Sequence, residues 1–399
     1  MKITHIHIER FRGFQNEDFE VGSLLTAIAG QNGTQKSTLL GIITQTFTLK
    51  TEDSMRVEKP LCGGSYISAF KDKFRLSPTF DKPKGHEWTI SFDAGMDDFT
   101  VESIKRTGDP NVRFWKKGAR QEGDGYISFP TIFLSLKRLV PVAEEAKIIT
   151  DDTLLTQEEL NEFKQLHNKI LIAQTPISSA TTITSKNKQS IGVSTELYDW
   201  NQNSMGQDNL GKIILALFSF KRLHDKYPRQ YKGGILAIDE MDATMYPASQ
   251  VELLKVLRKY ASKLNLQILF TTHSMSLLKA MDDLVQEVTK KEETANQAKI
   301  LYLKKVDDKI AIKQGVNFKG IQLDLNVVAE GNNRKKNRIT AYTEDKENIL
   351  FVKAILKSKA FVLDFVDVTL PCSTLMELVT KRVPAFIYPY SIVILDGDV

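Results

Sequence analysis

A glycine-containing loop lies between two apolar stretches near the start of the chain. Ser23–Ala29 is apolar and strand-like, the loop runs from Gly30 to Thr38, and an apolar stretch of helical character starts near Leu39. In a strand–loop–helix unit of this kind, backbone N–H groups surround a phosphate, a lysine neutralises its charge, and a hydroxyl group coordinates Mg²⁺. The loop therefore predicts an α/β fold with a phosphate site at the end of a buried strand.

The candidate nucleotide-binding residues in this loop are Asn32, Gly33, Thr34, Gln35, Lys36, Ser37 and Thr38. Lys36 is expected to neutralise the β- and γ-phosphates, and the Ser37 hydroxyl is expected to coordinate Mg²⁺. Gln35 departs from the usual pattern, because glycine normally precedes the lysine. Taken alone, the loop would also fit a plain turn that caps a helix.

Two further apolar strands end in polar side chains. Gly234–Ile238 is followed by Asp239 and Glu240. Asp239 at the tip of a buried strand can hold the Mg²⁺ shell, and Glu240 can polarise the attacking water. Leu269–Thr272 is followed by His273, which could contact the γ-phosphate. Considered one at a time, these residues also fit an exposed acidic turn and a structural histidine.

A fourth element, Ser204–Gln207, stands immediately before a predicted helix. The order of elements resembles that of the ABC/SMC-type ATPases, with Walker A at Gly30–Thr38, a signature loop at Ser204–Gln207, Walker B at Gly234–Glu240, a D-loop at Met241–Thr244 and an H-switch at His273. The resemblance covers roughly residues 1–305. It implies hydrolysis of ATP with Mg²⁺ by a homodimer or higher homo-oligomer whose heads close on the nucleotides, and Gln35 before the lysine predicts that this hydrolysis is slow. Ser204, Gly206 and Gln207 would then bind the γ-phosphate held by the other subunit.

The chain is expected to contain an ATPase head over residues 1–330 and a truncated TOPRIM-like αβ segment over residues 331–399. Short alternating segments predict an antiparallel β lobe at about 51–133. The Thr156–Glu159 capping box predicts a helical insertion at about 150–195, in which the Ser/Thr/Lys-rich stretch 175–190 is expected to be a mobile loop. Strand and helix alternate after residue 209, which predicts a largely parallel sheet.

Other segments indicate a branch of this superfamily. The opening Ile6–Phe14 and the later Ile238–Pro247 resemble OLD-type ATPases, and Phe133–Leu139 resembles the segment of that family that approaches the nucleotide. The two halves of the head are not separated by a long heptad arm, which excludes a true SMC rod.

The tail adds a possible second metal site. Glu344, Asp396 and Asp398 match the layout of TOPRIM domains, whose carboxylates hold Mg²⁺ or Mn²⁺ for phosphodiester chemistry. Asp345 and Asn348 depart from the TOPRIM pattern, in which glycine and aspartate are usual. The alternative for this segment is an αβ unit with exposed acidic turns.

OLD-type nucleases occur in prokaryotic anti-phage systems, including Gabija and some retrons, and related ATPases serve Septu-like systems. The resemblance implies a defence ATPase whose ATP-dependent dimerisation controls nucleic-acid cleavage by a fused TOPRIM-type nuclease. The alternative is an ATPase without nuclease activity of its own. It would assemble with a separate HNH-type nuclease, or with a retron RNA and its reverse transcriptase. The opening segment and the tail disfavour a transporter subunit.

The composition is mildly basic. The 54 Lys and Arg residues exceed the 49 Asp and Glu residues, which gives a net charge of +5 and permits contact with nucleic acid without requiring it. Cys62 and Cys372 stand far apart, so neither a zinc site nor a disulfide framework is expected. The longest apolar run, Ile213–Phe220, is too short to span a bilayer, and the first residues lack a signal-peptide pattern. These features predict a cytoplasmic protein without a membrane partner.

Overall fold

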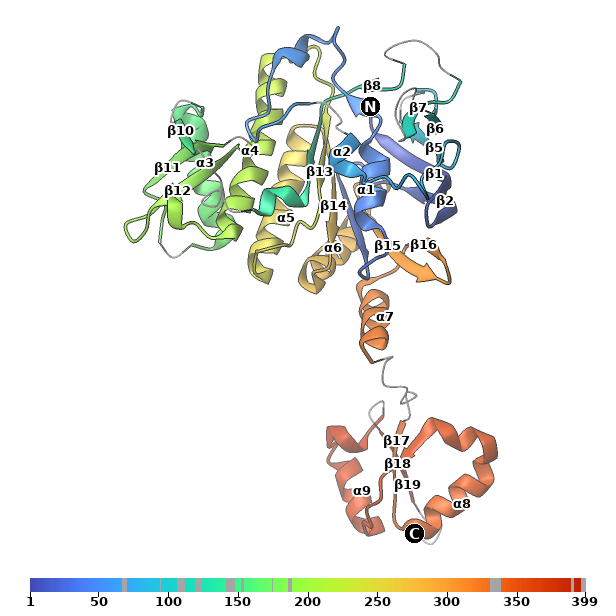
Figure 1. Cartoon of the computed structure of the whole chain (residues 1–399). Helices are drawn as coiled ribbons and strands as arrows, with labels where there is room; N and C mark the ends of the chain where they lie inside the picture. The colour runs from blue at the N-terminus through green and yellow to red at the C-terminus, as the bar shows by residue number, and fades with distance from the viewer. Residues whose placement is uncertain are drawn as a thin grey trace. The chain divides into compact units, whose positions relative to one another are not determined.

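The computed structural model describes residues 1–66, 70–93, 95–105, 112–118, 124–140, 148–151, 154–173, 175–185, 189–330, 339–388 and 391–395. The chain divides into two compact units, Met1–Gln322 and Leu323–Val399. The division falls within helix α7 (Phe318–Glu330), ahead of the polar segment at residue 331 that predicted the boundary (Figure 1).

A six-stranded sheet forms the centre of the first unit, in the order β16-β15-β3-β14-β13-β9. All neighbouring pairs are parallel except β15 with β16. The strands are β3 (Leu25–Gly30), β9 (Thr131–Leu134), β13 (Gly234–Ile238), β14 (Leu266–Thr272), β15 (Ala298–Val306) and β16 (Lys309–Gln314). Every residue of β3, β13 and β14 is buried, which explains their continuous apolar runs. Their parallel register brings Gly30, Ile238 and Thr272 to the same edge of the sheet.

Four helices lie against or beside this sheet (Figure 1). They are α1 (Lys36–Thr44), α4 (Met205–Lys226), α5 (Pro247–Lys263) and α6 (Met275–Val288). Helix α1 packs on β3 and β14, α5 on β14, and α6 on β15. No described helix is long and apolar enough to serve as a membrane span.

The antiparallel lobe differs from the one expected at residues 51–133. Its sheet has the order β2-β1-β5-β6-β7. The strands are β1 (Ile3–Phe11), β2 (Phe14–Glu20), β5 (Glu87–Phe92), β6 (Phe99–Lys105) and β7 (Val112–Lys116). The described part of 51–86 holds the short helices η1 (Ser54–Val57) and α2 (Phe70–Lys73) instead of strands. Strand β9 joins the central sheet, because its residues pair with the buried strand β13.

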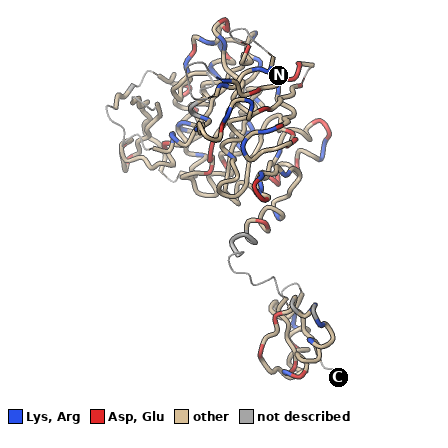
Figure 2. Tube along the Cα trace, turned by 45° about the vertical axis from the view of Figure 1, so that its right-hand side comes forward, with Lys and Arg blue, Asp and Glu red and all other residues tan. Residues whose placement is uncertain are grey.

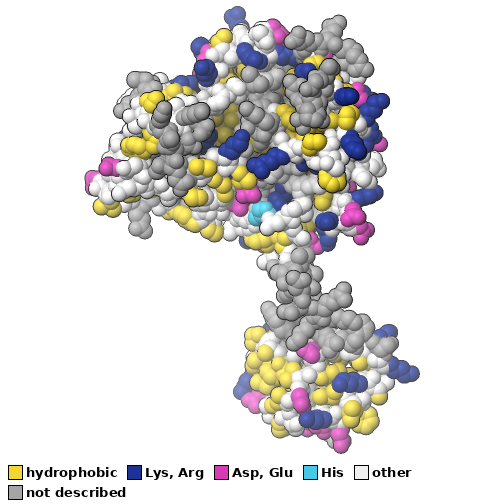
Figure 3. Space-filling view, viewed as in Figure 1, with side chains coloured by type: hydrophobic (Ala, Val, Ile, Leu, Met, Phe, Trp, Pro, Cys, Tyr) yellow, Lys and Arg dark blue, Asp and Glu magenta, His cyan; other side chains and the backbone are white. Residues whose placement is uncertain are grey.

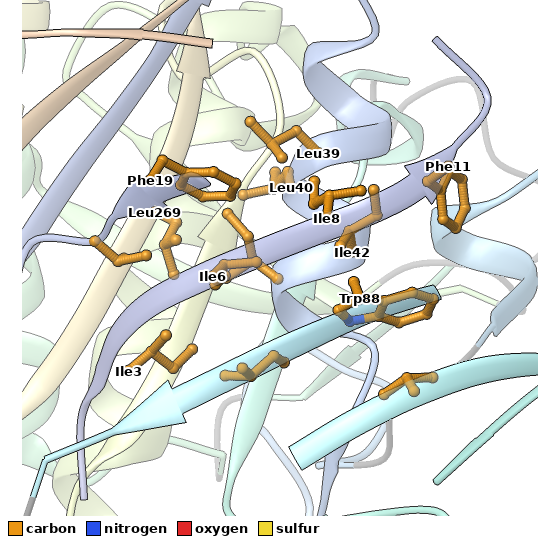
Figure 4. Close-up of a cluster of buried hydrophobic side chains, with 14 of the residues drawn as sticks. Ile3, Ile6, Ile8, Phe11, Phe19, Leu39, Leu40, Ile42, Trp88 and Leu269 are labelled. Carbon is orange, nitrogen blue, oxygen red and sulfur yellow. The ribbon is translucent and has the colours of Figure 1, made fainter. Parts of the chain in front are cut away.

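One apolar core joins the lobe to the helix that follows the phosphate loop. Ile6 and Ile8 of β1 and Trp88 of β5 cluster with Leu40 and Ile42 of α1 (Figure 4). All five side chains are fully buried. Burial of such side chains contributes about 1.5–3 kcal/mol each, so the lobe fixes the position of α1.

The insertion expected to be helical at residues 150–195 is a mixed unit. Its helix α3 (Gln157–Leu171) starts at the predicted Thr156–Glu159 capping box. The remainder forms a sheet of β10 (Ile149–Asp151), β11 (Ser179–Thr184) and β12 (Gln189–Ser194). The expectation of a mobile loop at 175–190 was therefore wrong for residues 179–184 and 189–190. β-Branched side chains such as Ile183 and Ile191 are buried there, and residues of this type fit a pleated, half-buried surface.

The second unit has a parallel three-stranded sheet in the order β18-β17-β19. Its elements are β17 (Ile339–Thr343), α8 (Lys346–Leu356), β18 (Leu363–Phe365), α9 (Cys372–Thr380) and β19 (Ser391–Ile394). Apolar side chains gather on the face of this unit seen in Figure 3. Helix α8 exposes Leu350, Phe351 and Ile355 at 67%, 66% and 77%.

Candidate nucleotide-binding site

The loop between β3 and α1 has the backbone shape that a phosphate site requires. Gly33 has φ 80° and Gln35, the N-cap of α1, has φ 62° and ψ 31°. Lys36 is buried, and its Nζ donates hydrogen bonds to the carbonyls of Gly30 at 3.1 Å and Gln31 at 2.8 Å. The ammonium group therefore lies against its own loop, where it can reach a phosphate held by the loop N–H groups.

The remaining loop residues divide into one structural side chain and several accessible ones. Thr34 Oγ1 donates to the Gln31 carbonyl at 2.8 Å, which ties the loop together. Asn32, Gly33 and Ser37 are exposed, and Thr38 is half-buried. Access to the site is therefore open at the residues expected to contact the nucleotide.

Two hydroxyl groups converge on one carboxylate oxygen. Ser37 Oγ donates to Asp239 Oδ1 at 2.9 Å, and Thr271 Oγ1 donates to the same oxygen at 2.7 Å. Ser37 comes from α1, Asp239 follows β13, and Thr271 lies in β14. A hydroxyl and a carboxylate oxygen are ligands that Mg²⁺ prefers. Ser37 and Asp239 therefore fit a Mg²⁺ ion, whose chemistry would be to neutralise charge on the phosphates.

The Glu240 backbone is held from both sides. Its N–H donates to Thr271 Oγ1 at 2.6 Å, and its carbonyl accepts from Arg138 Nη2 at 2.8 Å. Its φ of 48° is in the left-handed region, which costs a residue with a Cβ about 1–2 kcal/mol. A strained residue held in this way at the end of a buried strand is suited to present its carboxylate in one orientation.

Charges around Lys36 set the electrostatics of the site. Burial lowers the pKa of Lys36 to about 8, although the Glu240, Asp239 and Asp242 carboxylates favour its charged form. Burial, together with the nearby positive charge of Lys36, also lowers the pKa of His273 below its ordinary value. The backbone N–H of His273 donates to Asp242 Oδ1 at 3.4 Å. The structure thus brings Lys36 and His273 together with the three carboxylates.

The expected signature residues lie together at the start of α4. This signature group consists of Ser204, Gly206 and Gln207. Ser204 Oγ accepts from the Gln207 N–H at 3.3 Å, and Gln207 Oε1 accepts from the Ser204 N–H at 2.9 Å. Gln207 Nε2 also donates to Tyr198 Oη at 2.6 Å. A β-carbon on Gly206 would lie 2.5 Å from the Thr244 carbonyl oxygen, so this position requires glycine. The signature group therefore packs directly on the D-loop.

The tail carries only part of the predicted second metal site within the described residues. Strands β17 and β19 are parallel neighbours, with Thr343 opposite Ile394, so Glu344 follows β17 at the edge where β19 also ends. Asp396 and Asp398 lie outside the described residues. Asp345 caps α8 by accepting the Asn348 N–H at 2.9 Å. In the described part of the chain, His, Cys, Asp and Glu do not form a group of three that could hold a metal.

Three residues of the nucleotide site were not among the named candidates, although one of them, Arg138, lies in the segment Phe133–Leu139 that was expected to approach the nucleotide. They are Thr271, Asn209 and Arg138, which link Asp239, α4 and Glu240 by hydrogen bonds. Thr271 could have been found as a polar side chain inside an apolar strand. The sequence does not distinguish the buried Arg138 from its exposed neighbour Lys137, and the partners of Arg138 are not visible in it.

Residues 136–278 match the AAA ATPase domain family. This chain is an ATPase. The matched residues include Asp239, Glu240 and His273 together with the group at the start of α4. Nucleotide binding follows from this match, and the phosphate loop at Gly30–Thr38 lies before the matched segment.

The solved structures similar to this ATPase include SMC heads. One is the SMC head domain from Thermotoga maritima, with a TM-score of 0.43, 14% identity, and coverage of 79% of this chain and 100% of that chain. Another is an SMC head bound to the C-winged helix domain of ScpA (TM-score 0.47, 13% identity, 81% and 100% covered). A third, derived from Pyrococcus furiosus, is an Smc head domain with an extended coiled coil bound to the C-terminal domain of ScpA. Its TM-score is 0.44 and its identity 12%, and the match covers 82% of this chain and 99% of that chain. Comparison with curated proteins found no match.

Proposed function

We propose that this ATPase is of the ABC/SMC head type and acts in the cytoplasm as an ATP-dependent homodimer or higher homo-oligomer. The proposal is carried by two groups of residues that belong to different elements of the head. Lys36, Ser37 and Asp239 form one group at the phosphate loop, whereas Ser204 and Gly206 belong to the other, beside the D-loop. In the proposed dimer, the first group of one head and the second group of its partner hold the same nucleotide.

Within one head, the roles follow from chemistry and position. Lys36 neutralises the β- and γ-phosphates, and Ser37 with Asp239 holds Mg²⁺. Glu240 orients and polarises the attacking water, because its carboxylate follows a rigid strand and its backbone is bonded on both sides. His273 contacts the γ-phosphate as a neutral imidazole, consistent with its lowered pKa.

The dimer is proposed to control nucleic-acid cleavage in an OLD-type defence system. Support comes from the parallel βαβ order of the second unit and from Glu344 at the end of β17. Glu344 would hold Mg²⁺ or Mn²⁺ together with Asp396 and Asp398. Lys and Arg are spread over the first unit among acidic residues, as Figure 2 shows, which suits weak contact with a nucleic-acid backbone.

A second candidate is an ATPase without its own nuclease, which regulates a partner. It is favoured by the exposed Leu350, Phe351 and Ile355 on α8. Neighbouring apolar side chains with exposures above one half are typical of a surface covered by another protein. The partner would be an HNH-type nuclease, or a retron RNA with its reverse transcriptase.

One cleavage assay separates the two candidates. The purified ATPase is incubated with plasmid DNA and with RNA, with and without ATP, in Mg²⁺ or Mn²⁺. The fused-nuclease proposal expects cleavage that depends on the metal and is lost in Glu344→Ala, whereas Lys36→Ala loses only the response to ATP. Cleavage that survives Glu344→Ala contradicts the assigned metal site. Without cleavage of either substrate under any condition, the partner-dependent candidate is the one supported.

A further inference from the structure

Arg138 is a fully buried arginine that joins three parts of the nucleotide site. It lies in η2 (Leu136–Leu139), directly after β9, and only 2% of its surface is exposed. Nη1 donates to the carbonyls of Leu134 and Ser135 at 3.3 and 3.2 Å. These two bonds fix the guanidinium group to the end of β9.

The other two hydrogen bonds of Arg138 reach different elements. Nε donates to Asn209 Oδ1 at 2.7 Å, and Nη2 donates to the Glu240 carbonyl at 2.8 Å. Among the described residues, the four acceptors of Arg138 are all neutral oxygens. Burial lowers the pKa of Arg138 to about 10, although the nearby carboxylates of Asp239, Glu240 and Asp242 oppose this shift. The group stays charged at neutral pH.

Asn209 extends the connection to the D-loop. It is fully buried in α4, one turn after Ser204 and Gly206, and its Nδ2 donates to the Ala243 carbonyl at 2.9 Å. One side-chain amide therefore accepts from Arg138 and donates to the D-loop. A displacement of the first turns of α4 would change both bonds together.

Glu240 is the residue on which this connection acts. Its left-handed backbone is unfavourable for a glutamate and persists only if its surroundings hold it. Arg138 supplies the shorter of two hydrogen bonds to its carbonyl, at 2.8 Å, and the Ala243 N–H of the D-loop supplies the other at 3.1 Å. Loss of the Arg138 bond would leave the carbonyl with the Ala243 N–H, which belongs to the D-loop, so the peptide would relax and turn the carboxylate away from the attacking water.

We propose that Arg138 is a positioning residue that makes the orientation of Glu240 depend on the position of the first turns of α4. The proposal rests on the assigned role of Glu240 in hydrolysis. Binding of a γ-phosphate by Ser204 and Gly206 would act on α4, and Asn209 and Arg138 would pass the change to Glu240. Hydrolysis is then coupled to engagement of the signature group, because the same buried guanidinium bonds both the Glu240 carbonyl and Asn209 of α4.

Steady-state ATP hydrolysis of Arg138→Gln tests the proposal. We expect kcat to fall by about tenfold or more while KM stays within about twofold, because the lost bond orients the base without touching the phosphates. Arg138→Lys keeps one donor for the Glu240 carbonyl and should give an intermediate kcat. Arg222→Gln is the matched control, because Arg222 ties α4 to Glu159 and the Leu154 carbonyl away from the site. It should lower the melting temperature and leave kcat per folded molecule unchanged.

A second variant keeps the test decisive if Arg138→Gln folds poorly. Asn209→Asp keeps the acceptor for Arg138 and removes the N–H that donates to Ala243, so kcat should fall with KM unchanged. The double variant should be no slower than the slower single variant if both act along one path. Additive losses overturn the connection.

The Glu240→Gln variant, measured in the same series, separates this inference from the proposed function. An inactive Glu240→Gln beside a fully active Arg138→Gln overturns the positioning role alone. A fully active Glu240→Gln overturns the assignment of the base, and the positioning role fails with it.

Discussion

The side-chain amide nitrogen of Gln35 lies 2.8 Å from the position that a β-carbon on Gly13 would occupy. The phosphate loop therefore touches the turn between β1 and β2, and that turn accepts the Ile310 N–H through the Gly13 carbonyl at 2.8 Å. Gln35 Oε1 is buried and has no hydrogen-bond partner among the described residues. Gln35 thus combines a strained backbone with an incompletely satisfied side chain.

Replacement of Gln35 by glycine should tighten ATP binding. Glycine adopts positive φ without the penalty of about 1–2 kcal/mol, and 1.4 kcal/mol corresponds to about tenfold in affinity. Titration with a fluorescent ATP analogue and a turnover assay measure the two expected effects, tighter binding and faster hydrolysis. The parent is expected to bind ATP and turn it over slowly. Equal affinity and equal turnover in Gln35→Gly would show that the loop accommodates Gln35 without strain.

Variants of Lys36 and Glu240 should separate ATP binding from ATP hydrolysis. Lys36→Ala removes the cation that faces the phosphates and should abolish ATP binding. Glu240→Gln keeps the shape of the side chain but loses the base, so ATP should bind and accumulate in a closed dimer. Nucleotide titration, phosphate release and size-exclusion chromatography with ATP give the three readouts. Phosphate release by Glu240→Gln at the parent rate would assign the base to another group.

Alanine variants of Ser204 and Thr156 form a matched pair that tests the proposed dimer. Each caps a helix through a capping box, so replacement by alanine should cost about 0.5–2 kcal/mol of stability in either case. Only Ser204→Ala is expected to lose ATP-dependent assembly, measured by light scattering in the Glu240→Gln background. Gly206→Glu should also lose it, because its side chain places negative charge at the γ-phosphate and its β-carbon meets Thr244. Unimpaired assembly of both signature variants would argue against the sandwich.

ATP binding should take up a proton at alkaline pH. The pKa of Lys36 is lowered to about 8, and bound phosphates would raise it by favouring the charged form. Above about pH 8 the free protein holds a neutral lysine that must gain a proton, so affinity should fall by up to about tenfold per pH unit. Below about pH 8 the lysine is already protonated, so its protonation no longer affects the affinity. Calorimetry at pH 7 and pH 9 in buffers of different ionisation enthalpy measures the uptake directly.

Lys36→Arg provides the control for this pH effect. Its guanidinium group remains charged across the range, so any residual binding should show no proton uptake from this position. Equal proton uptake by the parent at both pH values would show that Lys36 does not titrate near pH 8.

The sequence allowed prediction of those parts of the fold that depend on local patterns. The continuous apolar run Gly234–Ile238 predicted a buried strand, and the Thr156–Glu159 pair predicted the start of a helix, because each pattern has one dominant physical cause. The local pattern of residues 179–184 gave a wrong prediction. Their Ser and Thr content is typical of loops, and they form a strand only because β10 and β12 supply partners.

The candidate site was predictable where a residue type has a characteristic role at a nucleotide, as with the lysine Lys36 and the carboxylate Asp239. Arg138 was not predictable in its role. Its partners include the backbone carbonyl of Glu240, 102 positions away in the sequence, and a backbone carbonyl carries no residue-type signal. Contacts of this kind become visible only when the elements that carry them have been packed.

The Gln207 N–H occupies one of the two lone pairs of the Ser204 hydroxyl oxygen and leaves the hydroxyl hydrogen directed elsewhere. A serine hydroxyl has a single hydrogen to donate, and its oxygen here already accepts the Gln207 N–H. The hydrogen and one lone pair remain, and both lie beside first-turn amides that carry partial positive charge. The start of α4 consequently discriminates by the sign of the charge that approaches it. An anionic oxygen gains a donor and a favourable potential, whereas an ammonium group or a bound cation gains at most one lone pair and meets an unfavourable potential.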